Sequence, residues 1–225
     1  MREFLFIPIN DYHAVNLFGL QMQLFSCCVP YFDNCLECIQ GPSFSATASY
    51  SQMTVPLTPS IRLDVSKSGK DVVILKEGER ICGTGAALGT LPIVQNKAYF
   101  QVNLQQNGVW GVGIGNSHAV LDKVPPATEF WGIRDNGDVI ANGVVIGKLN
   151  KPISEGDAIG VCYDHVELKF LVNGEWAEPS ITGVKGPAYP LLYVDESAIL
   201  DVKFRKFTED PPNGYGEILA EQTLL

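Results

Sequence analysis

Residues 156–175 read GDAIGVCYDHVELKFLVNGE. The first half, Ala158–Tyr163, is apolar throughout, as in a strand that is buried on both faces. In the second half the apolar side chains from Val166 to Val172 recur at every second position, which is typical of a strand with one solvated face. Asn173-Gly174 follows, and both residues tolerate the positive φ of a tight hairpin turn. This stretch therefore predicts paired antiparallel strands.

The same pattern of short apolar runs and turn residues extends along the chain from Ile61. Asn-Gly dipeptides begin at positions 107, 136, 142, 173 and 213, and short apolar runs flank most of them. The predicted strands are 72–75, 80–82, 99–104, 109–114, 130–134, 138–140, 144–146, 158–163, 166–172, 190–194 and 200–204. Beyond residue 61 a helical period is suggested only for one turn at 216–221. Many short strands with regularly spaced turns predict an all-β fold, an antiparallel β-sandwich.

Composition and charge narrow the class of protein. The chain has 225 residues, of which 46% are hydrophobic, so it can build a core and is not wholly disordered. Its formal net charge is −9. Because sequence-independent binding of nucleic acid needs clustered cations that displace phosphate counterions, this balance argues against a nucleic-acid partner.

The first sixty residues differ from the rest. Residues 41–60 are mostly Gly, Pro, Ser and Thr, which is typical of a linker. The uncharged stretch 14–32 contains Asn, Gln, Gly and Pro, so a short amphipathic helix is a better interpretation than a membrane span. Met1–Ile9 is too short for a signal peptide. We predict that residues 1–60 form a largely disordered N-terminal extension and linker.

Six cysteines divide into a cluster and two isolated residues. The cluster at positions 27, 28, 35 and 38 admits three interpretations: a zinc site, acylation of Cys27 and Cys28, or ordinary thiols. Adjacent cysteines make a poor zinc knuckle, so we predict no metal site. Cys82 and Cys162 lie alone in apolar runs and are predicted to be reduced and buried. With no Asn-x-Ser/Thr acceptor in the sequence, this predicts a cytoplasmic or nuclear protein, peripheral on membranes if acylated.

The sequence offers little support for a catalytic or phosphate-binding site. The chain has three histidines and no Gly-x-Ser-x-Gly elbow. Asp164-His165-x-Glu167 does not converge, because residue 164 faces away from the other two on a strand, and a hairpin turn is predicted instead. Gly83–Gly89 lacks the following helix and nearby cation of a phosphate loop, which favours a bend in a strand.

Several blocks resemble the SPRY domain family. They are residues 96–102, 110–113, 130–134, 156–175 and 188–192, in that order along the chain. The resemblance covers about residues 62–208, so we predict a SPRY domain at 61–208 and a C-terminal arm at 209–225 that packs on the sandwich. It implies a concanavalin-like jelly roll that binds a protein partner through loops at the sandwich ends, without catalysis and without a cofactor.

Candidate partner-binding residues lie in the predicted loops. They are Asn116, His118 and Leu121 in the long segment 115–128, and Trp176 and Lys185 between later strands. Trp176 follows an Asn-Gly turn and is either an exposed interface anchor or a lid over the sandwich end. Trp110 and Trp131 are predicted to lie in the core.

The sequence thus predicts a non-catalytic protein-interaction module. Two alternatives remain. One is the same module tethered to membranes through acylated cysteines. The other is a sandwich-fold glycosidase, which needs two carboxylates about 5–10 Å apart. The adjacent Asp195 and Glu196 point to opposite faces of a strand and do not supply such a pair.

Overall fold

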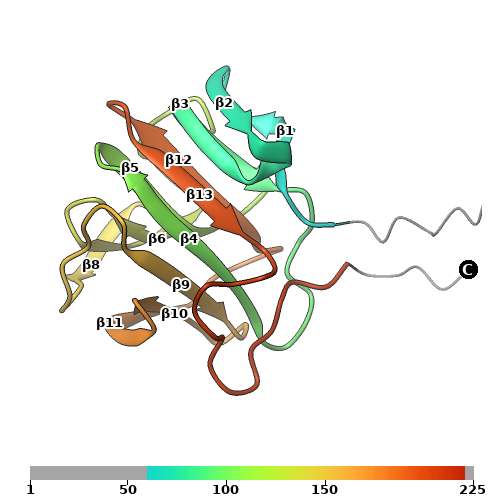
Figure 1. Cartoon of the computed structure of the whole chain (residues 1–225), viewed down its shortest axis with the longest axis vertical. Helices are drawn as coiled ribbons and strands as arrows, with labels where there is room; N and C mark the ends of the chain where they lie inside the picture. The colour runs from blue at the N-terminus through green and yellow to red at the C-terminus, as the bar shows by residue number, and fades with distance from the viewer. Residues whose placement is uncertain (1–59, 221–225) are drawn as a thin grey trace, which may run out of the picture. The chain divides into compact units, whose positions relative to one another are not determined.

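Two antiparallel β-sheets pack against each other in the computed structural model, which describes residues 60–220 (Figure 1). The antiparallel β-sandwich predicted from the sequence is confirmed. The strands are β1 (Leu63–Ser68), β2 (Asp71–Leu75), β3 (Arg80–Gly89), β4 (Ala98–Gln106), β5 (Val109–Gly115), β6 (Phe130–Arg134), β7 (Asp138–Ala141), β8 (Val144–Lys148), β9 (Ala158–Tyr163), β10 (Glu167–Val172), β11 (Glu175–Thr182), β12 (Tyr189–Asp195) and β13 (Ile199–Lys203). A 3-10 turn, η2 (Lys76–Gly78), joins β2 to β3.

Strand β3 belongs to both sheets. Sheet A has the strand order β1-β3-β12-β5-β6-β7-β8, and sheet B has the order β2-β3-β13-β4-β9-β10-β11. The first half of β3 pairs with β2 and β13, and its second half pairs with β12 and β1. The ten-residue strand therefore passes from one layer of the sandwich into the other.

Two glycines allow β3 to bend from sheet B into sheet A. Gly83 has φ +91° and Gly85 has φ +131°, a backbone region that side-chain-bearing residues seldom adopt. Gly83 is the partner of Val72 in sheet B, and Gly85 is the partner of Val194 in sheet A. As predicted, these glycines serve a bend in a strand.

The core lies between the sheets and follows the predicted periodicity. Strand β9 is buried at nearly every position because β4 and β10 flank it, and β12 is buried between β3 and β5. Trp110 and Trp131 are 0% and 4% exposed, so their predicted place in the core is confirmed. Val166 is 70% exposed and precedes β10, so its predicted place on the buried face of that strand is wrong.

Asn-Gly turns close two of the hairpins. Asn142 and Gly143, between β7 and β8, both have positive φ, as do Asn173 and Gly174 between β10 and β11. These are the conformations that twisted two-residue turns require.

The sequence pattern missed two strands and added a helical turn. Strand β1 buries only Leu63 completely, and β11 contains Pro179 and an irregular register, so neither shows a clean alternation. Trp176 accordingly lies within a strand, not in a loop as predicted. Residues 216–220 form an isolated bridge and irregular chain, so the turn of helix predicted to begin at residue 216 is wrong.

The predictions for residues 1–59 lie outside the described part of the chain. These are the N-terminal linker, the amphipathic helix and the cysteine cluster with Cys27 and Cys28. Within residues 60–220, no helix has the length and apolar character to cross a membrane.

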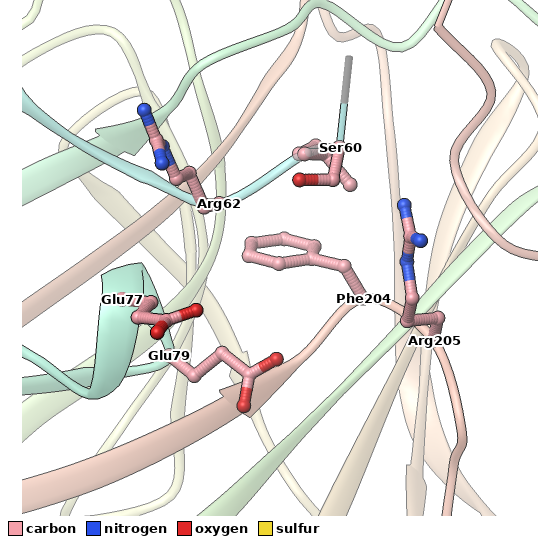
Figure 2. A pocket seen from close by; sticks show the side chains of 7 residues that line it. Ser60, Arg62, Glu77, Glu79, Phe204 and Arg205 are labelled. Atoms are coloured by element: carbon pink, nitrogen blue, oxygen red, sulfur yellow. The ribbon is translucent and has the colours of Figure 1, made fainter. Parts of the chain in front are cut away.

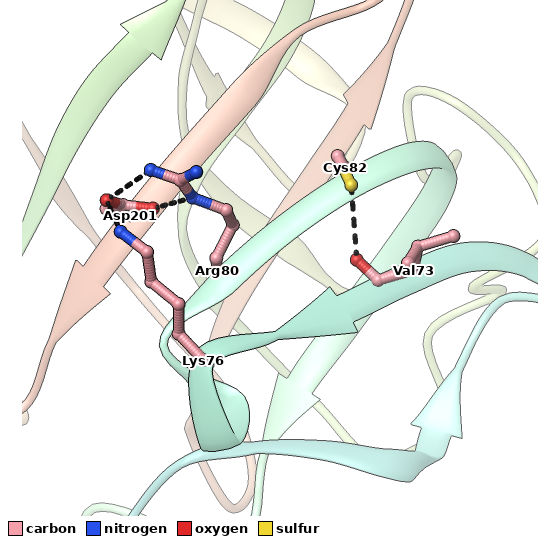
Figure 3. Close-up of polar contacts among 5 residues, drawn as sticks. All are labelled: Val73, Lys76, Arg80, Cys82 and Asp201. Carbon is pink, nitrogen blue, oxygen red and sulfur yellow. Dashed lines mark hydrogen bonds and ion pairs between the residues drawn. The ribbon is translucent and has the colours of Figure 1, made fainter. Parts of the chain in front are cut away.

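A charge cluster joins η2, β3 and β13 on the outer face of sheet B (Figure 3). The Arg80 guanidinium donates to both carboxylate oxygens of Asp201, and the Lys76 ammonium donates to Oδ2 at 2.8 Å. The Asp201 side chain is 15% exposed. Burial by itself would raise the pKa of Asp201, but the two cations outweigh it and hold this pKa below its usual value.

The bend in β3 predicts a stability effect. In Gly83→Ala the new Cβ would lie 2.3 Å from the Asp71 carbonyl oxygen at φ +91°. Because that oxygen belongs to the backbone of a paired strand, we expect a loss of at least about 2 kcal/mol in the free energy of unfolding, measured by urea denaturation. Gly216→Ala, whose Cβ meets nothing within 4 Å, should change it by less than about 0.5 kcal/mol. Equal stability of the two variants would contradict the role of Gly83.

The charge cluster predicts a pH dependence. A carboxylate whose pKa is lowered in the folded state stabilises it above the unfolded pKa of about 3.9, and this stabilisation is lost as pH falls through the folded-state value. We expect Asp201→Asn to lose about 1–3 kcal/mol at pH 7 in urea denaturation, with the gap to the unmodified protein narrowing below about pH 4. The exposed Asp71→Asn should show no such gap. A loss that is the same at pH 3 and pH 7 would contradict the assignment.

Candidate functional site

One surface hollow lies where the described chain begins (Figure 2). It holds about 220 Å³ and is lined by Ser60, Ile61, Arg62, Glu77, Glu79, Phe204 and Arg205. Figure 2 shows the Phe204 ring among the four charged side chains. A neighbouring hollow of about 600 Å³ shares Arg62 and Glu77. Two cations and two carboxylates line the first hollow, so its charge favours neither an anionic nor a cationic ligand.

Trp176 stands between two other hollows. The first holds about 580 Å³ and is lined by Lys169, Trp176, Ala177, Glu178, Pro179 and Ser180. The second holds about 480 Å³ and is lined by Leu171, Gly174, Trp176, Asp210, Pro211, Pro212, Asn213 and Tyr215. Trp176 is 46% exposed, whereas the other two tryptophans are buried. We call Trp176 and the linings of these two hollows the Trp176 surface.

Strand pairing positions the indole. Ala177, the next residue of β11, is buried in the core, so Trp176 points to the outer face of sheet B. Its partner across the hairpin is Leu171 of β10. Leu171 is buried in an outer cluster with Tyr99 and Cys162. The exposed tryptophan therefore adjoins a packed apolar base.

The segment after β13 covers that outer cluster, and it is the red coil at the C-terminal end in Figure 1. Phe207 packs edge-on against the Tyr99 ring with centroids 4.7 Å apart. Tyr215 also packs on the cluster, and its hydroxyl donates to Asp164 at 3.3 Å. Residues 207–215 thereby form one side of the Trp176 surface.

A buried glutamine holds this segment in place. Gln101 on β4 is fully buried, and its Oε1 accepts the backbone N–H groups of Thr208 at 3.0 Å and Glu209 at 3.3 Å. Its Nε2 donates to Asn103 Oδ1 at 2.6 Å and to the Thr208 hydroxyl. Because a buried amide without partners costs about 1–3 kcal/mol, this bonding ties the segment to sheet B.

The loop from Asn116 to Glu129 covers the outer face of sheet A. Leu121 packs against an apolar cluster on that face, and its carbonyl oxygen accepts the Ala86 N–H at 2.8 Å. Leu121 therefore anchors the loop. Asn116 is half-buried and His118 is exposed.

The five residues predicted to contact a partner do not form one surface. A Cβ at Gly186 would lie 2.6 Å from Asn116 Nδ2, so the loop that carries Lys185 adjoins the loop that carries Asn116. Lys185 itself is exposed. Neither hollow beside Trp176 has any of the other four residues in its lining.

The polar residues weighed for catalysis have structural roles here. Asp164 accepts the backbone N–H groups of Val166 and Glu167, which closes a turn. Asp195 accepts the Thr84 hydroxyl at 2.9 Å. Across residues 60–220, no group of three or more His, Cys, Asp or Glu side chains is arranged to hold a metal ion.

The two described cysteines differ in burial. Cys162 is buried as predicted, and this burial raises the pKa of its thiol to about 12, so it stays protonated and unreactive at neutral pH. Cys82 is only half-buried, so the prediction of burial is wrong there. It faces outward beside the edge strand β2, where its thiol lies 3.7 Å from the Val73 carbonyl oxygen (Figure 3).

Sequence reasoning missed most of the Trp176 surface. Lys169, Glu178 and the proline-rich residues 210–213 come from three separate segments, and only folding brings them together. One signal was available in the sequence. Leu171 is apolar at a position of β10 that alternation assigns to the solvated face, which indicates that another segment covers it.

Comparison with known proteins identifies relatives. A family model described as SPRY domain matches residues 97–207. SPRY domain-containing protein 7 of Gallus gallus is 41% identical over 171 residues, covering 74% of this chain and 87% of the relative. The protein of the same name from Homo sapiens is 40% identical over the same shares. The resemblance expected from the sequence blocks is confirmed.

Solved structures share the fold. The SPRY domain of human HERC1 has a TM-score of 0.53 at 16% identity, covering 62% of this chain and 96% of that domain. The PSpry domain of TRIM65 also has a TM-score of 0.53, at 10% identity, covering 65% and 90%. At such identities the likeness is one of fold alone.

The bonds of Gln101 predict the behaviour of the segment after β13. In Gln101→Leu the amide that accepts from Thr208 and Glu209 is lost while the side-chain volume is nearly kept. We expect the backbone amides of residues 207–215 to exchange with solvent about tenfold faster or more, measured by hydrogen exchange. Gln105→Leu changes an exposed glutamine of the same strand and should leave that exchange unaltered. Unchanged exchange in Gln101→Leu would show that other contacts hold the segment.

Proposed function

Because the chain belongs to the SPRY domain family, we propose that it is a non-catalytic protein-interaction module whose contact with its partner centres on Trp176. SPRY domains are generally protein-interaction modules. The observation that carries the choice of site is the 46% exposure of Trp176 between two hollows. Tryptophan is enriched among the residues that dominate interface energy, because it buries a large area at a small entropic cost.

The residues around Trp176 are held in place before a partner binds, which suits a docking surface. Trp176 lies on a paired strand, and the tie between Gln101 and Thr208 holds the opposite wall of the second hollow. A surface that is ordered before binding loses little conformational entropy when a partner docks. The proposed contact thus lies on the outer face of sheet B, and not on the end loops predicted from the sequence alone.

The adjoining loops offer a second candidate contact surface for the same function. Asn116, His118 and Lys185 lie on two loops that meet at Gly186. Their contact with a partner remains a prediction, as does a cytoplasmic location. Attachment to membranes through Cys27 and Cys28 also remains a prediction.

Affinity capture with the full chain tests the choice of site. Baits are the unmodified protein, Trp176→Ala and Val166→Ala, the last being a control at an exposed apolar residue. We expect partners recovered by the unmodified protein and by the control to fall about 30-fold or more with Trp176→Ala, because a central tryptophan contributes about 2 kcal/mol or more. Quantitative mass spectrometry measures the recovery.

Two further measurements show whether a fall in recovery reflects a lost contact at Trp176. Thermal unfolding should place Trp176→Ala within a few degrees of the unmodified protein, since the side chain is half-exposed. A photo-crosslinking residue at position 176 should label the same partner that capture recovers. If all three baits return the same partners in equal amounts, the contact does not centre on Trp176. His118→Ala then tests the loop surface.

A further inference from the structure

We propose that the partner segment that docks on the Trp176 surface carries an arginine that lies against the indole. This inference rests on the proposed function and adds the chemical class of the partner. It follows from how the charges around Trp176 are paired, and from which charges are left without a counterion.

The first hollow presents a free carboxylate beside the indole. Lys169 is the cation in its lining, and the Glu167 carboxylate already engages the Lys169 ammonium. Glu178 lines the same hollow and is exposed. Within the described chain Glu178 makes no ion pair. A ligand that enters this hollow therefore meets an unneutralised negative charge next to Trp176.

The second hollow repeats this arrangement. Asp210 is exposed in its lining and makes no ion pair with any residue between 60 and 220. A Cβ on Gly174 would lie 3.3 Å from a carboxylate oxygen of Glu209, so a second acid stands at this rim. Lys97 lies 5.4 Å from the Tyr215 ring centroid, outside the lining of the hollow.

Glu175, next to Trp176, does not add to this free charge. Its carboxylate is engaged by the Lys151 ammonium, and this pair holds the pKa of Glu175 below its usual value. The free acids in the two linings are thus Glu178 on one side of Trp176 and Asp210 on the other, with Glu209 at the rim beside Asp210. Glu178 and Asp210 each share the lining of a hollow with Trp176, and the whole chain carries a net charge of −9.

A guanidinium fits this combination of groups. A cation near an indole face is attracted by the ring quadrupole, and tryptophan gives the strongest such contact. Arginine is favoured over lysine because its planar group stacks on the ring while its N–H donors still reach a carboxylate. An acidic or phosphorylated segment would meet repulsion from both sides of the indole.

Peptide selection tests the inference. A display library of random 12-residue peptides is panned on the unmodified full chain, and the peptides retained are those whose binding is lost in Trp176→Ala. We expect arginine to be enriched at least threefold over the library in this set, and lysine to be enriched less. Their affinity should fall as ionic strength rises, because the attraction is partly screened.

Amide variants of the free acid in each lining, Glu178 and Asp210, provide the matched test. Glu178→Gln combined with Asp210→Asn should weaken the retained peptides at least tenfold, measured by fluorescence anisotropy. Asp71→Asn combined with Glu196→Gln removes two exposed acids outside both hollows and should change affinity less than twofold. Replacing arginine in a retained peptide by citrulline, which keeps the shape without the charge, should also weaken it at least tenfold.

The outcomes separate this inference from the proposed function. If the retained peptides lack basic residues, or bind the Glu178/Asp210 double variant as well as the unmodified protein, the arginine assignment is wrong while Trp176 remains the docking site. If no selected peptide depends on Trp176, both the arginine assignment and the choice of site are wrong. Enrichment of arginine with loss in the double variant supports both.

Discussion

The bend of β3 at Gly83 and Gly85 is the constraint on which the two-layer arrangement depends. A single strand hydrogen-bonds in sheet B through its first half and in sheet A through its second. Positive φ at both glycines turns the chain between the layers without a loop. Because β2, β13, β12 and β1 all pair with β3, the relative placement of the two sheets follows from this one strand.

Each sheet has an outer face that an irregular segment covers. The loop from Asn116 to Glu129 packs on sheet A through Leu121, and the segment after β13 packs on sheet B through Phe207 and Tyr215. Because these segments cover part of each outer face, apolar residues occur on faces that a simple sandwich would expose to solvent. They also define where the covered surface ends, and Trp176 lies at that boundary on sheet B.

The position of Trp176 connects fold and function in physical terms. An indole that is half-exposed over an ordered base offers apolar area without the entropic cost of ordering a loop. Near Trp176, Lys169 pairs with Glu167 and Lys151 pairs with Glu175. A ligand therefore meets the unpaired acids of the two linings, Glu178 and Asp210, with Glu209 at the rim. Family membership indicates the kind of function, and the arginine that we propose for the partner rests on this local chemistry.

Local patterns along the chain predict the strands with strong alternation, the Asn-Gly turns, the buried Trp110 and Trp131, and the family. These features are local, since a side chain's hydrophobicity and a residue's tolerance of positive φ are set within a few positions of the chain. The place of Trp176, on a strand with hollows on both sides, follows instead from how distant segments pack. That surface joins β10 and β11 to residues 210–215, and no local pattern encodes contact between segments that lie so far apart along the chain. Val166 and Cys82 show the same limit, because burial depends on which segment covers a face and not on the residue alone.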